Sequence, residues 1–190
     1  MSILEFLQTY GVRLANGTLI TCAQFLAATI VAVLAALLAG LGRMSKNRAI
    51  RTLATVYIEI FRGTSLLVQL YWIFYVLPLF GVSLPKFIAG FLSVGLNVGA
   101  YGAEVVRGAI SAVPRGQWEA ATALNMSQAQ MLRRIILPQA FVAMIPPWGN
   151  LFIELLKSTA LVSLITLTDL AFKAQQMNQT TMKTIPIFTL

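Results

Sequence analysis

The stretch EAATALNMSQAQMLRRIILP, residues 119–138, is a polar, amphipathic island in a chain that otherwise has the composition of a membrane protein. It begins with Glu119-Ala120-Ala121, and Asn125 follows after three further residues. A nine-residue spacer then leads to Ile135, and Leu137-Pro138 comes one residue later. A segment of this kind indicates a loop outside the lipid rather than a membrane-spanning helix.

The same stretch predicts two short helices joined by a tight corner. Asn tolerates the left-handed conformation that ends many helices, second only to Gly. We therefore expect one helix over residues 117–124, closed by Asn125. Ser127 and Gln130 have the spacing of a capping box, so a second helix should begin there and run to about residue 137.

This spacing resembles the EAA loop of the permease subunits of ABC importers, which reads EAA, three residues, Gly, nine residues, Ile, one residue and Leu-Pro. The one departure is Asn125 in place of Gly. The resemblance implies that the loop at about 107–138, called the coupling loop below, docks into a cleft on an ATPase subunit and transmits the force of ATP binding. The residues it assigns to this role are Glu119, Ala120, Ala121, Asn125, Ile135, Leu137 and Pro138. An amphipathic surface loop without a partner is the alternative interpretation.

Composition indicates a membrane protein without reference to any family. The chain is 58% hydrophobic and only 11% charged, more apolar surface than a soluble core of 190 residues can bury. Histidine is absent, which excludes His-based catalysis and His-ligated metal. Cys22, the only cysteine, lies in an apolar run and is expected to be a small buried residue. We expect no metal or cofactor site in this chain.

Predominantly apolar runs with few charges predict four transmembrane helices, at 18–41, 54–80, 87–106 and 139–156. A helix needs about 20 residues to cross the hydrocarbon core. The fourth contains Pro146-Pro147 and is expected to be broken or bent there. Residues 160–170 predict a short or re-entrant segment shielded by protein. Residues 1–190 are thus predicted to form a single all-α, polytopic membrane domain.

Basic residues predict the orientation of these helices. Two connections hold clusters of them, which are Arg43, Lys46, Arg48 and Arg51 after the first helix, and Arg107, Arg115, Arg133 and Arg134 around the coupling loop. The other side receives only scattered ones, namely Arg13, Lys86, Lys157, Lys173 and Lys183. The positive-inside rule then places the N-terminus outside and the coupling loop in the cytoplasm. The net charge of +8 belongs mainly to these clusters, so no nucleic-acid partner is expected.

Three further segments resemble the polar amino acid branch of these permeases: YIEIFRGT at 57–64, YGAEVVRGAI at 101–110, and PPWGN at 146–150 leading to LLKST at 155–159. The resemblance implies the transmembrane domain of a type I ABC importer in a bacterial inner membrane. It also implies a second permease subunit, identical or homologous, an external solute-binding protein, and two ATPase subunits that bind ATP and Mg. A fifth helix is implied as well, and the apolar residues 185–190 are expected to begin it.

Candidate solute contacts come from acid–base pairs spaced by three residues, which share one helix face. These pairs are Glu59 with Arg62, Glu104 with Arg107, and Glu154 with Lys157. Glu154 and Lys157, with Asn150 and Ser158, could hold both charges of a zwitterion, or they could simply neutralise each other at the outer rim. Glu59 and Arg62 could line the path, gate it or contact a second subunit. Gln69 is a further candidate, or it only bonds a neighbouring helix.

Two other classes of protein fit this sequence less well. A secondary transporter or channel not driven by ATP should show internal repeats or paired broken helices, and only one Pro-broken segment is visible. A membrane-embedded enzyme would need a nucleophile and a base, but the chain has no Gly-x-Ser-x-Gly pattern, no histidine and a single Asp, Asp169. We therefore expect a non-catalytic subunit.

Overall fold

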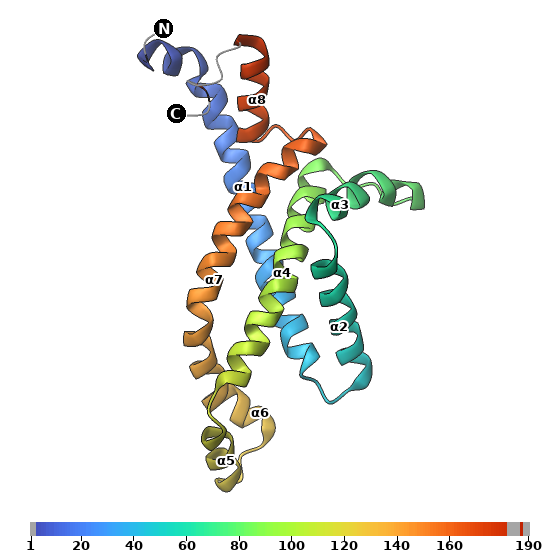
Figure 1. Cartoon of the computed structure of the whole chain (residues 1–190), viewed down its shortest axis with the longest axis vertical. Coiled ribbons are helices and arrows are strands. Elements are labelled where there is room, and N and C mark those ends of the chain that lie inside the picture. The colour runs from blue at the N-terminus through green and yellow to red at the C-terminus, as the bar shows by residue number, and fades with distance from the viewer. Residues whose placement is uncertain (1–2, 182–186, 188–190) are drawn as a thin grey trace. The chain divides into compact units, whose positions relative to one another are not determined.

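The computed structural model describes residues 3–181 and 187, and the side chains of residues 11–180 and 187 (Figure 1). Every element in this part of the chain is helical, as predicted. In order they are α1 (Ile3–Arg43), α2 (Arg48–Gly63), α3 (Leu66–Tyr71), a π-turn (Trp72–Val76), a 3₁₀ turn (Leu77–Phe80), α4 (Lys86–Ala112), α5 (Arg115–Ala123), α6 (Gln128–Met131), a π-turn (Leu132–Ile136), α7 (Leu137–Thr159), a 3₁₀ turn (Ala160–Ile165) and α8 (Leu170–Thr181). The segment 185–190, predicted to begin a fifth helix, lies outside the described residues except for Ile187.

Three helical stretches in the described residues are long and apolar enough to cross a membrane: Gly11–Arg43, Lys86–Ala112 and Gln128–Ile165. A bent pair, Arg48–Gly63 with Leu66–Phe80, makes a fourth if it counts as one span. The predicted helices at 18–41 and 87–106 are therefore confirmed, and both are longer than predicted. Cys22, predicted to be buried, is instead exposed on α1.

The prediction of one continuous helix over 54–80 was wrong. α2 ends at Gly63, and Thr64 is extended, with φ −119° and ψ 152°. Ser65 then caps α3 by accepting a hydrogen bond from the N–H of Leu67 (3.3 Å). Residues 66–80 after this break are uncharged and more apolar than α2, so hydropathy alone gives no sign of a helix end. The local signals are Gly, which weakens a helix, and Ser at an N-cap, which starts a new one.

Of the predicted break or bend at Pro146-Pro147, the break was wrong, because α7 runs through both prolines, and the bend stays a prediction. Each proline removes one backbone donor, and membrane helices tolerate this where nearby groups satisfy the freed carbonyls. The predicted short segment at 160–170 is found only in part, and Val162, Ser163 and Ile165 within it are buried as expected. Its first six residues extend α7 as a 3₁₀ turn, and Thr166 ends that turn in the left-handed conformation with φ 60°.

The chain divides into two compact units, and each is described here by itself. The first comprises the described residues of Met1–Ile30, Ser65–Gly95 and Leu155–Leu190. The second comprises Val31–Thr64 and Leu96–Glu154, and it contains the coupling loop.

In the second unit, α1 and α4 pack closely through small residues. A Cβ on Gly40 would lie 2.9 Å from the Ala103 carbonyl oxygen and 2.9 Å from both Cβ and Cγ1 of Val106. Contacts this short essentially never occur for a real Cβ, so only glycine allows the two backbones to approach here. The hydroxyl of Tyr57 on α2 donates to the Leu96 carbonyl of α4 (2.6 Å), and this hydrogen bond joins α2 to the pair of α1 and α4.

Gly40→Ala is expected to lower thermal stability, because the added methyl forces α1 away from α4. Overpacking of this kind costs about 1–3 kcal/mol, or about 2–4 °C in the unfolding midpoint for each kcal/mol in a chain of this size. Gly108→Ala on α4 is the matched control. A Cβ at Gly108 would meet no atom within 4 Å from other elements of the described chain, and Ala is the better helix former, so the midpoint should hold or rise. Equal midpoints for the two variants in detergent would contradict the close approach at Gly40.

In the first unit, α1 contacts both α4 and α8. The side-chain amide of Gln24 donates to the Phe87 carbonyl (2.9 Å), and Gln24 is 1% exposed. The hydroxyl of Thr21 accepts a hydrogen bond from the N–H of Leu170 (3.2 Å), which fixes the start of α8 on α1. A Cβ on Gly17 would lie 3.0 Å from the Leu170 Cα, so glycine permits this contact too.

Candidate coupling loop and solute path

The prediction of two loop helices joined at Asn125 is confirmed. Asn125 follows the end of α5 and has a left-handed φ of 55°. Its N–H donates to the Thr122 carbonyl (2.9 Å), and the N–H of Met126 donates to the Ala121 carbonyl (3.1 Å). These two hydrogen bonds form a Schellman motif, in which a left-handed residue satisfies the last carbonyls of a helix. Asn is one of the few residues other than Gly that takes this conformation at low cost.

The capping box at the start of the second loop helix is also confirmed. The hydroxyl of Ser127 accepts from the N–H of Gln130 (3.3 Å), and the side-chain oxygen of Gln130 accepts from the N–H of Ser127 (3.0 Å). Each side chain thus satisfies a backbone donor that the helix start leaves unpaired. The corner and the cap together define the direction of both helices.

The predicted end of this second helix near residue 137 was wrong. α6 continues through the π-turn into α7, with no break at Leu137-Pro138. In the wider turn the N–H of Leu137 donates to the carbonyl of Leu132, five residues earlier. Pro138 has no backbone N–H and so donates no hydrogen bond within the helix. The side-chain amide of Gln139 donates to the Ile135 carbonyl (3.0 Å). The loop is therefore joined to the membrane helix without a flexible connection.

The residues assigned to coupling divide between an exposed and an inner face. Glu119, Ala120, Asn125 and Pro138 are exposed, while Ile135 and Leu137 are half-buried. Ala121 is 0% exposed and belongs to a cluster with Met131 and Ile136, against which Ile135 and Leu137 pack. The inner residues hold the two helices together, and Glu119 on the outside remains accessible to another protein.

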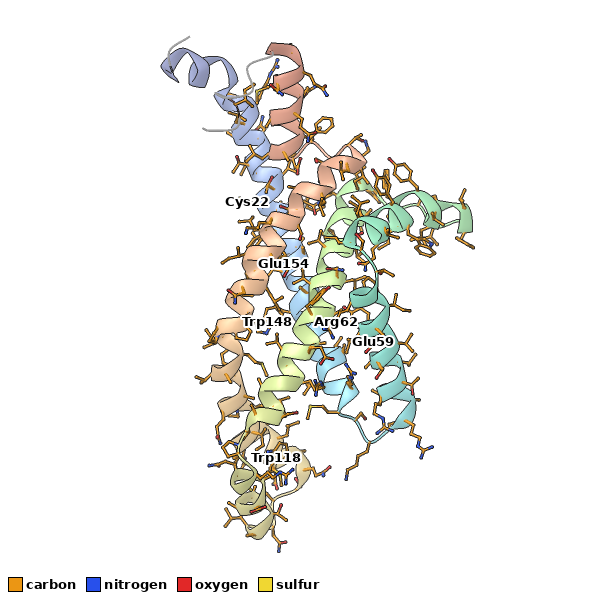
Figure 2. The ribbon with its side chains drawn as sticks, viewed as in Figure 1. Cys22, Glu59, Arg62, Trp118, Trp148 and Glu154 are labelled. Carbon is orange, nitrogen blue, oxygen red and sulfur yellow. The ribbon has the colours of Figure 1, made fainter. Side chains whose placement is uncertain are left out.

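A cavity of about 780 Å³ opens beside α5. Trp118 and Glu119 line one part of it, and Met131 lines another. Met44 and Lys46, from the segment that follows α1, also line it. Sequence reasoning used this segment only for orientation, because no spacing rule links residues 44–46 to a loop more than 70 positions away. Figure 2 labels Trp118 at this place in the fold.

A chain of charges joins three helices of the second unit. The predicted pair of Glu104 and Arg107 is confirmed, with Arg107 Nη2 2.8 Å from Glu104 Oε2. Arg43, in the last turn of α1, also donates to Glu104. Its Nη2 lies 3.6 Å from Oε1 of Glu59 on α2. Arg43 was missed because it lies 61 residues from Glu104 in the chain.

The predicted pair of Glu59 and Arg62 is not formed. No ion pair joins them among the residues that the structure describes, although they lie one turn apart on α2 (Figure 2). The Arg62 guanidinium instead lies 5.3 Å from the centre of the Tyr101 ring. A cation over an aromatic face is attracted by the ring's quadrupole. Partners from other helices thus replace the local pair.

The remaining solute-path residues lie in separate units. Asn150 and Glu154 share one face of α7 in the second unit and are both exposed. Lys157 and Ser158, exposed and half-buried respectively, belong to the first unit, so the pairing of Glu154 with Lys157 stays a prediction. Gln69 on α3 is buried at 8% exposure.

No group of three or more His, Cys, Asp or Glu residues that could hold a metal ion occurs in the described part of the chain.

Comparison with known proteins supplies the context for this geometry. A family model described as "Binding-protein-dependent transport system inner membrane component" matches residues 28–190. A probable amino-acid ABC transporter permease protein of Sinorhizobium fredii is 51% identical over 157 residues, which cover 80% of this chain and 66% of that protein. The L-cystine transport system permease protein TcyB of Bacillus subtilis is 43% identical over 169 residues, covering 89% and 72%. A putative glutamine transport system permease protein of Rickettsia bellii is 42% identical, covering 85% and 75%.

Two solved structures share the fold. An amino acid ABC transporter solved with histidines is 36% identical, with a TM-score of 0.90, and the match covers 100% of this chain and 88% of that one. The inward-facing MetNI methionine ABC transporter has a TM-score of 0.81 over the same shares at 18% identity, which shows the fold alone. The predicted type I importer membrane domain is therefore confirmed as the fold of this chain.

Proposed function

The chain belongs to the family of binding-protein-dependent transport system inner membrane components, and from this premise we propose that it is the membrane-spanning permease subunit of an ATP-driven importer. Its proposed solutes are amino acids or related small zwitterions, because the relatives are named as amino-acid, cystine and glutamine permeases. The match spans 66% of the length of the Sinorhizobium relative.

The observation that carries this proposal is the geometry of the coupling loop. Two short helices meet at the left-handed Asn125, and α6 continues without a break into α7. A push on such a loop reaches the membrane helix without being absorbed by a flexible linker. Glu119 and the cavity beside it offer an exposed, charged surface to a partner. A membrane-spanning carrier driven by an ion gradient has no use for a rigid loop of this kind.

ATP is bound and hydrolysed by other chains. Two ATPase subunits bind ATP and Mg and contact the coupling loop, so this chain is a non-catalytic subunit without a cofactor of its own. A second permease subunit completes the path through the lipid, and an external binding protein delivers the solute. Glu59, Arg62, Gln69, Asn150, Glu154, Lys157 and Ser158 are the proposed lining of that path. The membrane is the bacterial inner membrane, with the N-terminus outside.

Reconstitution tests this function directly. The full chain is co-expressed with a candidate ATPase and binding protein, purified as a complex, and placed in vesicles that contain ATP. We expect uptake of a labelled amino acid that stops when ATP is replaced by a non-hydrolysable analogue. Uptake driven by a proton or sodium gradient without any ATPase would instead identify a secondary transporter.

Cysteine labelling tests the orientation. In a Cys22→Ser background, Ser83→Cys is expected to react with an impermeant thiol reagent added outside the cell, while Ser111→Cys is shielded. Both serines are exposed on the protein surface, so only the membrane can distinguish them. A permeant reagent should label both variants, which controls for reactivity. Labelling of both variants by the impermeant reagent would reject the orientation.

A further inference from the structure

The start of α8 holds a buried carboxylate with one unpaired oxygen. Asp169 is 2% exposed, and its Oδ1 accepts a hydrogen bond from the N–H of Phe172 (2.8 Å). Its Oδ2 is enclosed and has no hydrogen-bond partner among the described residues. Burial raises the pKa of this carboxyl above its usual value, against the lowering effect of the Phe172 N–H. A buried carboxylate without full hydrogen bonding is costly, so such a group is normally retained for a partner or a function.

The same side chain lines a cavity of about 630 Å³ in the first unit. Lys157, from the last turn of α7, lines this cavity too. No ion pair joins Lys157 to Asp169 in the described structure, so the cavity presents an acid and a base that do not neutralise each other. Thr18 and Thr21 contribute hydroxyl groups, and Leu156 contributes to an apolar wall. This volume lies in the range of small-ligand sites, which are mostly apolar with a few polar groups.

The carboxylate is held in place by the packing of α8 on α1. The N–H of Leu170 donates to the Thr21 hydroxyl, and Gly17 lets the two backbones come close. Asp169 also caps α8. Its backbone carbonyl accepts a hydrogen bond from the N–H of Lys173 (3.0 Å), and its side-chain Oδ1 accepts one from the N–H of Phe172. The position of Oδ2 is thus set by the fold before any ligand arrives.

We propose that this cavity binds a small zwitterionic solute, with its ammonium group on Asp169 and its carboxylate on Lys157. An ammonium carries three donors and supplies the hydrogen bond that Oδ2 lacks, while Lys157 donates to both oxygens of a carboxylate. The choice of solute rests on the proposed importer function, and the site shares Lys157 with the proposed solute path and adds Asp169 to it. Because Oδ2 is enclosed, the ligand must displace a lining side chain, and association is slower than diffusion.

Calorimetric titration of the full chain in lipid nanodiscs, without any ATPase, tests the site. The probes are L-glutamine, butylamine and butyrate. Asp169→Asn keeps an oxygen for Phe172 and should weaken the binding of glutamine and butylamine by about 10- to 100-fold, the loss of one charge-assisted hydrogen bond. Lys157→Gln should weaken glutamine similarly and leave butylamine unchanged. Lys173→Gln on α8, which does not line the cavity, is the matched control and should bind all three probes normally.

Several results would overturn the site. These are no binding of glutamine or butylamine by the unsubstituted chain, equal affinity in Asp169→Asn, or loss of butylamine binding in Lys157→Gln. If Asp169→Asn does not fold, competition on the unsubstituted chain decides instead: butylamine should displace glutamine, and butanol should not. ATP-driven uptake is measured separately. Uptake without binding here removes only this site, whereas absence of uptake for every amino acid removes the importer function.

Discussion

Glu119→Lys is expected to leave the chain in the membrane and to abolish most of its ATP-driven uptake. Glu119 is exposed on α5 and lines the cavity beside the coupling loop, where Lys46 already supplies a positive charge. Reversal of the charge would leave a basic group of the ATPase unpaired at the proposed contact. Loss of one partner in such a pair costs about 2–5 kcal/mol, or roughly 30-fold to several-thousand-fold in affinity.

The measurements are uptake in vesicles and retention of the ATPase on the affinity-purified permease. Glu119→Gln is the matched control, because it removes the charge without reversing it and should lose less of both activities. Surface expression of each variant is measured at the same time. Normal uptake by well-expressed Glu119→Lys would rule out docking through this residue.

Asn125→Val is expected to reduce uptake and ATPase retention together, and Asn125→Gly is expected to preserve both. Asn125 has φ 55°, and a β-branched side chain is strongly disfavoured there. The strain amounts to about 1–3 kcal/mol at the joint between α5 and α6. The loop can relieve it only by breaking the hydrogen bonds that Thr122 and Ala121 accept.

The Gly variant separates the conformation from the side chain. Gly adopts positive φ without strain, so it retains the corner while removing the Asn amide. Equal uptake by the Val and Gly variants would mean that coupling does not depend on this corner. Loss of uptake in both would instead assign a role to the amide itself.

The local structure of the coupling loop was predictable because its causes are local. The left-handed Asn125 and the capping box of Ser127 with Gln130 depend on hydrogen bonds between residues at most five positions apart. Their chemistry can therefore be recognised from spacing alone. The end of the second helix could not be predicted in this way. Pro138 ends a helix only where the hydrogen bond that its missing N–H would make is required, and the π-turn just before Pro138 changes the hydrogen-bond pattern there.

Helix positions in the membrane were predictable only where hydropathy and local capping agree. α1 and α4 each contain a long, predominantly apolar run, and both were found. After Gly63 the residues become more apolar while the backbone turns, because Ser65 offers a new N-cap. At Pro146-Pro147 the reverse holds, since the sequence signals a break and α7 continues.

By itself, then, the amino-acid sequence determined the all-α class, the long spans of α1 and α4, and the two helices of the coupling loop. Composition and hydrogen bonds between near neighbours decide these features. Spacing of three residues correctly predicted the pair of Glu104 with Arg107, but only the tertiary structure decided which charges meet between helices. Arg43 reaches Glu104 and Glu59 from another helix, and Arg62 turns to Tyr101, so the expected pair of Glu59 with Arg62 does not form. The enclosure of Asp169 in a cavity that Lys157 also lines depends likewise on how α1, α7 and α8 pack. Electrostatic partners between helices depend on proximity in space, which spacing along the chain does not reveal.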